Sequence, residues 1–152
     1  MSSLNPHNVS NKFQLTKTIT SKIATVYVYN KNILVVEVNE GVNLSYASAA
    51  SLLFKGLLVL KNKPWVYISN RVNSYSVVPT DYEHLHKIGT LKALSIVVPS
   101  GTDPSTTAIE QIFCRKPFKL FNNGLEEAMI WAEKMLKDEV DDLKNERNSL
   151  LL

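Results

Sequence analysis

Hydrophobic positions along the chain follow two patterns: short runs rich in β-branched and aromatic residues, and longer stretches with an apolar residue every three or four positions. The runs at residues 23–29 and 33–38 are joined by a short polar turn, which predicts an antiparallel hairpin. The earlier alternation of Phe13, Leu15 and Ile19 predicts either a longer first strand or a separate edge strand. Three further apolar runs predict strands at residues 65–69, 94–98 and 117–121.

The stretches with helical spacing predict four helices, three between these strands and one after the last strand. We expect the first helix to follow the N-cap Asn43 and to end near Leu60. The second is expected to begin at Thr80 and Asp81, and the third at Asp103. The predicted apolar faces are Leu44, Ala47, Ala50, Phe54, Leu57 and Leu58 of the first helix, Tyr82, Leu85, Ile88 and Leu91 of the second, Ala108, Ile109, Ile112 and Phe113 of the third, and Leu125, Ala128, Met129, Ala132, Met135 and Leu136 of the fourth.

The resulting order of elements, ββαβαβαβα, predicts one α/β domain with a mixed, mostly parallel sheet and helices packed on it. The opening hairpin gives this sheet an antiparallel edge. Residues 1–12 are rich in Ser and Asn and are expected to form a flexible tail, and the domain itself is expected at residues 13–136. Residues 137–152 are expected to extend the last helix.

This extension keeps an apolar spacing of four and three residues beyond the point where a small domain needs its last helix. The positions with this spacing are Leu136, Val140, Leu143, Arg147 and Leu150. Three interpretations stay open: an end that frays in solvent, a short two-stranded seam, or an arm that docks on the basic body of the protein. Self-association as a homodimer is therefore a prediction, with Leu136, Val140, Leu143 and Leu150 as its candidate residues.

Composition excludes several classes of protein. The chain has 152 residues, of which 45% are hydrophobic and 20% charged, and a net charge of +3, which fits a compact domain rather than a disordered chain. No apolar run is long enough to span a membrane, so we expect no transmembrane segment. Cys114 is the only cysteine, which excludes an intramolecular disulfide. The polar first twenty residues do not resemble a secretory signal, so a cytoplasmic location is expected.

Charge is distributed unevenly along the chain. Residues 125–152 contain eight acids and four bases, a net charge of −4, whereas the other 124 residues carry +7. The local basic clusters are small, and scattered bases of this kind normally keep a domain soluble, so we expect no nucleic-acid partner. These clusters are Lys61 with Lys63, and Arg115 with Lys116 and Lys119.

Two segments resemble a known family. At residues 113–131 a Pro-Phe-x-x-Phe strand leads into a helix that begins Glu-Glu-Ala and reaches Trp131, and at residues 30–38 a strand is followed by a helix entered through Val42 and Asn43. With the element order, they are similar to the SpoIIAA-like branch of the STAS superfamily, the domain shared by sulfate transporters and anti-sigma-factor antagonists. The similarity runs from about Phe13 to Leu136.

The resemblance implies a non-catalytic protein-interaction or regulatory domain, whose partner is another protein. Domains of the antagonist kind bind a kinase or phosphatase and are switched by phosphorylation of a Ser that follows an Asp at the start of the second helix. That Asp-Ser-x-Gly motif is absent here: Ser74 and Ser76 occupy the region, and the phosphosite is carried over to neither. The candidate partner-contact residues are Arg71, Asn73, Ser74, Tyr75 and Ser76.

An alternative function also comes from the resemblance, because more distant SpoIIAA-like relatives have been likened in fold to lipid-carrier domains. It implies a binder or carrier of a small apolar ligand, such as a lipid. We expect its pocket between the sheet and the helices that contain Phe54 and Tyr82.

Residues with reactive side chains give no sign of catalysis. His84 and His86 lie two positions apart on a helix, so their side chains diverge and cannot hold one metal ion as an i, i+4 pair would. Cys114 lies beside two bases but has no nearby His to activate it, which favours a structural cysteine. Gly-rich phosphate loops and the G-x-S-x-G motif are absent. We therefore expect no enzyme, no cofactor and no metal.

Overall fold

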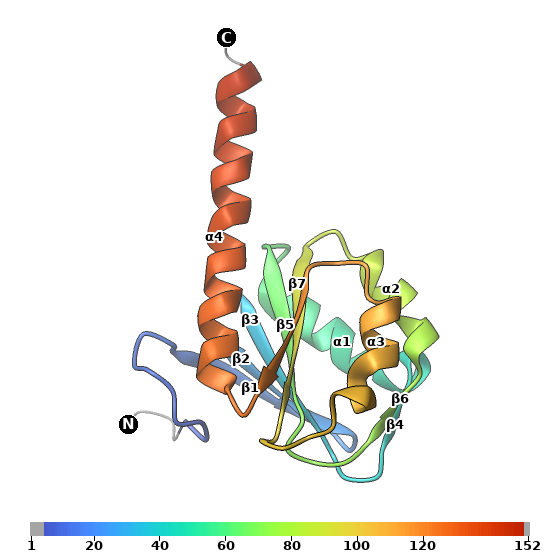
Figure 1. Ribbon diagram of the computed structural model, residues 1–152. Coiled ribbons are helices and arrows are strands. Elements are labelled where there is room, and N and C mark those ends of the chain that lie inside the picture. The colour runs from blue at the N-terminus through green and yellow to red at the C-terminus, as the bar shows by residue number, and fades with distance from the viewer. Residues whose placement is uncertain (1–4, 151–152) are drawn as a thin grey trace.

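A six-stranded mixed sheet forms the centre of the computed structural model, which describes residues 5–150 except for the side chains of residues 139–142 (Figure 1). Its strands lie in the order β1-β2-β3-β5-β7-β8. The first three are antiparallel, and β3, β5, β7 and β8 run parallel. The strands are β1 (Leu15–Thr20), β2 (Ala24–Tyr29), β3 (Ile33–Val38), β5 (Trp65–Asn70), β7 (Leu91–Val98) and β8 (Phe118–Asn122). The predicted α/β class, with a mostly parallel sheet and antiparallel N-terminal strands, is confirmed.

Helices lie on both faces of the sheet (Figure 1). On one face are α1 (Tyr46–Leu60), α2 (Tyr82–His86) and α3 (Ala108–Phe113), and on the other is α4 (Leu125–Leu150). Two short 3-10 helices, η1 (Pro79–Asp81) and η2 (Pro104–Thr107), precede α2 and α3, and β4 (Asn43–Leu44) pairs with β6 (Ser76–Val77) in a separate parallel ribbon. Within residues 5–150, no helix is long and apolar enough to cross a membrane.

Several predicted boundaries change. The N-cap of α1 is Ser45, whose side chain accepts a hydrogen bond from the backbone N–H of Ser48, whereas the predicted cap Asn43 lies in β4. Leu15 and Ile19 of the predicted alternation lie in a separate edge strand, β1, whereas Phe13 precedes this strand and is buried in the core. The predicted second helix is shorter, because Leu91 begins β7, and the N-terminal antiparallel unit has three strands instead of two.

The predicted apolar face of α4 is confirmed. Ala128, Met129, Ala132 and Leu136 are all buried against the sheet. The opposite side of this helix is rich in charged residues, so its periodicity identifies the buried face without ambiguity. Leu136, which the sequence also suggested for self-association, is 7% exposed and belongs to this core.

The predicted face of α1 is wrong in part: Leu57 packs against the core, but Phe54 and Leu58 do not. The buried residues are Leu52, Gly56 and Leu60, whereas Phe54 and Leu58 are each 62% exposed. This helix is apolar on nearly all sides, so spacing alone does not identify the side that faces the sheet. Gly56 is placed where α1 approaches β3 closely, because a Cβ atom there would lie 3.2 Å from Leu34 Cδ2.

The predicted face of α3 is wrong, because its apolar residues are exposed and a charged residue is buried. Ile109, Ile112 and Phe113 are 57%, 76% and 40% exposed, while Glu110 on the inner side is 5% exposed. Glu110 is held inside by an ion pair with Arg71, which lies just beyond the end of β5. This long-range contact, rather than helical amphipathicity, orients α3.

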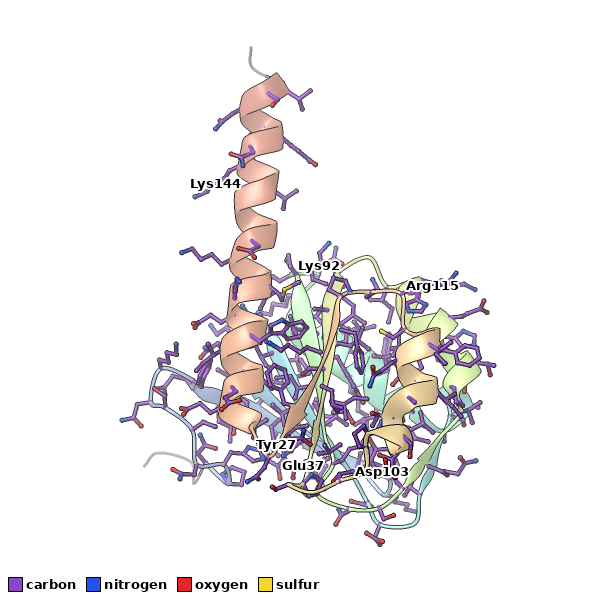
Figure 2. All side chains as sticks on the ribbon, in the orientation of Figure 1. Tyr27, Glu37, Lys92, Asp103, Arg115 and Lys144 are labelled. Atoms are coloured by element: carbon purple, nitrogen blue, oxygen red, sulfur yellow. The ribbon has the colours of Figure 1, made fainter. Side chains whose placement is uncertain are left out.

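The C-terminal half of α4 runs past the sheet and away from the rest of the molecule (Figure 1). Figure 2 shows side chains of this half, Lys144 among them, projecting into solvent. Leu143 and Leu150 are 48% and 86% exposed. Val140, the remaining predicted self-association residue, has a side chain outside the described residues.

Candidate functional site

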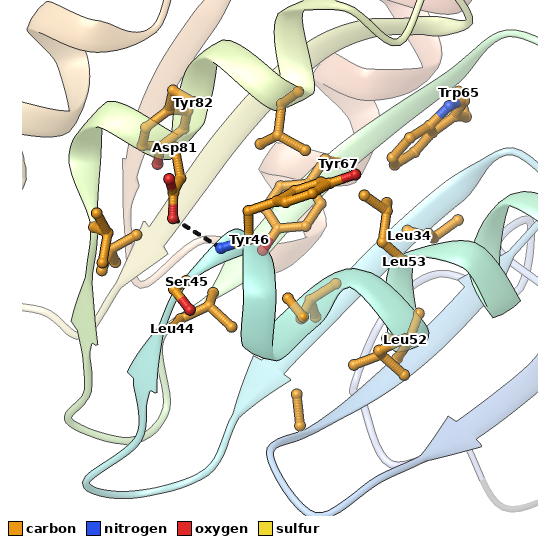
Figure 3. A pocket seen from close by; sticks show the side chains of 17 residues that line it. Leu34, Leu44, Ser45, Tyr46, Leu52, Leu53, Trp65, Tyr67, Asp81 and Tyr82 are labelled. Carbon is orange, nitrogen blue, oxygen red and sulfur yellow. Dashed lines mark hydrogen bonds between the residues drawn. The ribbon is translucent and has the colours of Figure 1, made fainter.

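An apolar cavity of about 120 Å³ lies between α1, the start of α2 and the sheet (Figure 3). It occupies the place where the sequence suggested a ligand pocket. Tyr82 lines it, whereas Phe54 points away and is 62% exposed. The lining residues are Ala24, Val26, Leu34, Val36, Trp65 and Tyr67 from the sheet, Ser45, Tyr46, Ala49, Leu52 and Leu53 from the N-terminal half of α1, and Leu44, Val77, Val78, Asp81, Tyr82 and Leu85 from the β4–β6 side and α2.

Contacts of the N-terminus of α1 with η1 and α2 form part of the rim of the cavity. The backbone N–H of Tyr46 donates a hydrogen bond of 2.8 Å to Asp81 Oδ2, drawn as a dashed line in Figure 3. The ring of Tyr46 stacks on His84, with the ring centroids 4.1 Å apart. Asp81 is the one charged residue in the described lining, and its carboxylate is engaged at the N-terminus of α1, where it also complements the helix dipole.

Two tyrosines of the lining, Tyr67 and Tyr82, have hydroxyl groups with perturbed pKa values, and Ser45 and Tyr46 add two more hydroxyls. The Tyr82 hydroxyl donates a 2.7 Å hydrogen bond to Glu110 Oε2, and burial together with this carboxylate raises the pKa of Tyr82. Burial also raises the pKa of Tyr67. Both phenols therefore stay neutral at physiological pH. They are unsuited to removing a proton from a ligand.

Behind Tyr82, the candidate partner-contact residues Arg71 and Tyr75 belong to an internal polar network. Arg71 pairs with Glu110, and its guanidinium lies over the Tyr75 ring, 5.1 Å from the centroid. The Tyr75 hydroxyl lies 2.6 Å from Ser69 Oγ. Burial alone would lower the pKa of Arg71, but the hydrogen bond and charge of Glu110 outweigh it and raise this pKa. Arg71 therefore keeps its positive charge in the folded protein.

Of the other candidate contact residues, Asn73 and Ser74 lie in the loop between β5 and β6, and Ser76 begins β6. The side-chain amide of Asn73 donates to the Val38 carbonyl oxygen over 3.1 Å, and Ser76 Oγ donates to Asn43 Oδ1 over 2.9 Å. Ser74 is exposed, and its backbone N–H donates to a Glu40 carboxylate oxygen. Contact of this loop with another protein stays a prediction.

A second polar cluster lies at the carboxyl ends of β3 and β5 and was missed by the sequence reasoning. His7 Nε2 lies 2.6 Å from Glu37 Oε2, and His7 Nδ1 lies 2.6 Å from the Tyr29 hydroxyl. Asn70 donates a 2.7 Å bond to the same Glu37 oxygen. The predicted tail thus includes a residue with specific contacts to the sheet. The only sequence signal was Glu37, a lone carboxylate within an apolar strand.

This cluster makes stability depend on pH. Burial alone would raise the pKa of Glu37, but the hydrogen bonds from His7 and Asn70 outweigh it and lower this pKa. Because the folded-state pKa lies below the unfolded one, Glu37 stabilises the protein above the unfolded pKa, and the contribution is lost as pH falls through the folded pKa. We expect the free energy of unfolding of the wild type, measured in urea, to fall more steeply below about pH 4.5 than that of Glu37→Gln.

A matched control is Glu133→Gln, which removes a half-exposed carboxylate that pairs with Lys12. This change should leave the acid limb of the wild-type profile nearly intact. Parallel profiles for the wild type and Glu37→Gln would contradict the prediction.

The remaining candidate residues do not form a reactive group. His86 Nε2 accepts a hydrogen bond from the backbone N–H of Arg115, while His84 stacks on Tyr46. Burial raises the pKa of the Cys114 thiol, the opposite of what a nucleophilic cysteine needs. In the part of the chain that the structure describes, no three His, Cys, Asp or Glu side chains are grouped so that they could hold a metal ion.

The cavity thus combines an apolar lining, neutral phenols and one carboxylate already engaged by the backbone, a set of groups suited to binding an apolar molecule. Compared with protein-family models, curated proteins and solved structures, the chain shows no significant match.

Proposed function

We propose that the protein binds a small apolar molecule in the cavity between α1, α2 and the sheet. The observation that carries this proposal is a volume of about 120 Å³ lined almost entirely by apolar side chains. Apolar cavities of roughly 150 Å³ stay free of water and accept benzene or xenon. A ligand that fills such a space gains about 25 cal/mol for each Å² of apolar surface removed from water.

The cavity volume favours a small ligand. A compound with one ring, or a short branched aliphatic compound, matches about 120 Å³, whereas a long-chain lipid would extend beyond this space through the open side of the cavity. We therefore favour a monocyclic compound over the lipid suggested by the family resemblance.

The test is thermal unfolding with benzene, toluene or phenol present at increasing concentration. Binding to the folded state alone should raise the Tm, by an amount equivalent to about 2.7 kcal/mol at a hundred times the Kd. Ala49→Phe fills the cavity from α1 and should abolish the shift. Ala47→Phe, on the exposed side of the same helix, should retain it. A shift that persists in Ala49→Phe would place the compounds elsewhere.

A regulatory STAS-like domain that recognises another protein is the second candidate function. It is favoured by Val72, Asn73 and Ser74, three consecutive exposed residues at the carboxyl end of β5. The mixed sheet and the junction from β8 into α4, at residues 118–131, support the proposed kinship with SpoIIAA-like domains. If none of the three compounds shifts the Tm, the cavity proposal fails and recognition through this loop becomes the favoured function.

A further inference from the structure

We propose that the outer face of α3 binds the projecting half of α4 from a second copy of the chain. The α3 patch consists of Ile109, Ile112 and Phe113, three large apolar side chains that are 57%, 76% and 40% exposed. The α4 arm is residues 137–150, the part of α4 beyond the buried Leu136. Contiguous exposed apolar groups on a domain surface mark interaction sites.

The contacts of Glu110 with residues of other elements fix the orientation of α3. Glu110, on the same helix as the patch, accepts hydrogen bonds from Arg71 and from the Tyr82 hydroxyl. Burying an ion pair costs several kcal/mol of desolvation, and replacing such a pair with apolar residues is often neutral or stabilising. The contacts of Glu110 therefore hold α3 with its carboxylate buried and its isoleucines exposed, the reverse of the orientation that helical amphipathicity favours. The fold thus keeps the α3 patch exposed to solvent.

The α4 arm lacks support from its own domain. It runs away from the sheet as a single helix (Figure 1) and exposes Leu143 and Leu150. These two leucines continue the spacing of the buried Leu136, so they form one apolar stripe along the arm. An isolated helix of about 14 residues is marginal in water, and burial of an apolar stripe normally stabilises it.

Geometry and charge identify a second copy as the partner. The arm belongs to the helix on the opposite face of the sheet from α3 and points away from the body (Figure 1), so it does not reach the patch of its own chain. The arm contains five acids and three bases, a net charge of −2, whereas the first 124 residues carry a net charge of +7. Arg115, exposed two residues after α3, gives the patch a basic border, although Glu83 lies 3.9 Å from it.

Reciprocal exchange of two arms closes as a two-fold dimer, the commonest symmetry of soluble oligomers. A seam between two arms is a poorer alternative. Leu136 is already buried in its own domain, and Arg147 would occupy a core position of such a seam. An arm on the α3 patch instead pairs apolar with apolar surface, and its net charge of −2 is opposite in sign to that of the first 124 residues.

The test is sedimentation velocity of the full chain and of two variants. The wild type should be a dimer, and Ile112→Asp and Leu143→Asp should each weaken dimerisation about tenfold or more. Both side chains are exposed, so both variants should keep the circular dichroism of the wild type. Phe54→Asp is the matched control: it places the same charge at an equally exposed apolar position on α1 and should leave the dimer intact.

Mixing the two variants separates this arrangement from an arm–arm seam. Each Ile112→Asp chain retains an intact arm and each Leu143→Asp chain retains an intact patch, so the mixture should form a heterodimer through one arm–patch contact, visible by native mass spectrometry. A wild-type monomer, a dimer that survives Ile112→Asp, or the absence of a heterodimer in the mixture would each overturn the proposal.

Discussion

Replacing Arg71 with Ala is expected to lower the free energy of unfolding by about 3–5 kcal/mol. The change leaves Glu110, which is 5% exposed, as a buried carboxylate without its cation. It also removes the guanidinium from the Tyr75 ring, which adds a smaller loss of packing. Because a buried charge costs far more alone than in a pair, this single change should be among the most destabilising in the molecule.

Urea denaturation of single and double variants measures the effect. Arg71→Met with Glu110→Leu removes both charges and should recover most of the stability lost in Arg71→Ala. The control is Lys12→Ala, which breaks the Lys12–Glu133 pair of 3.1 Å between half-exposed side chains and should cost less than about 1 kcal/mol. Similar losses of unfolding free energy in Lys12→Ala and Arg71→Ala would contradict the prediction, because they would mean that water solvates the Glu110 carboxylate once Arg71 is removed.

The ion pair between Arg71 and Glu110 also explains why the orientation of α3 could not be predicted from the sequence. Ile109, Ile112 and Phe113 have the spacing of a buried helical face, and nothing near them indicates that they are exposed. The residue that turns them outward is Arg71, far away in the chain, and its contact with Glu110 exists only after folding. Helical periodicity predicted α4 correctly because a charged face opposes its apolar face, a contrast that α1 does not have.

The candidate site, too, could be predicted only in part. A pocket between two helices and the sheet could be predicted, because parallel strands joined by helices leave such spaces at their junctions. Its lining could not, because the rotation of α1 decides that Ala49 and Leu53 line the cavity while Phe54 does not. The contact between His7 and Glu37 was equally hidden, since a polar N-terminal segment gives no sequence signal of where it docks.

The orientation of α1 predicts which of its apolar residues contribute most to stability. Leu60→Ala is expected to lower the free energy of unfolding by about 2–5 kcal/mol, because Leu60 is 1% exposed and its loss leaves a cavity against the sheet. Phe54→Ala, which removes a larger side chain from the same helix, should change it by no more than about 0.5 kcal/mol, since Phe54 is 62% exposed. The face predicted from spacing would give the opposite ranking.

Urea unfolding of the two variants, compared at equal m-values, decides between the two orientations of α1. Both changes introduce Ala, the residue with the highest helix propensity, so propensity favours the variants slightly and does not account for a loss in Leu60→Ala. A loss of more than about 2 kcal/mol in Phe54→Ala would mean that Phe54 is buried, either in the domain or by a partner chain. Repeating the measurement at several protein concentrations separates these cases, because only burial between chains makes the loss depend on concentration.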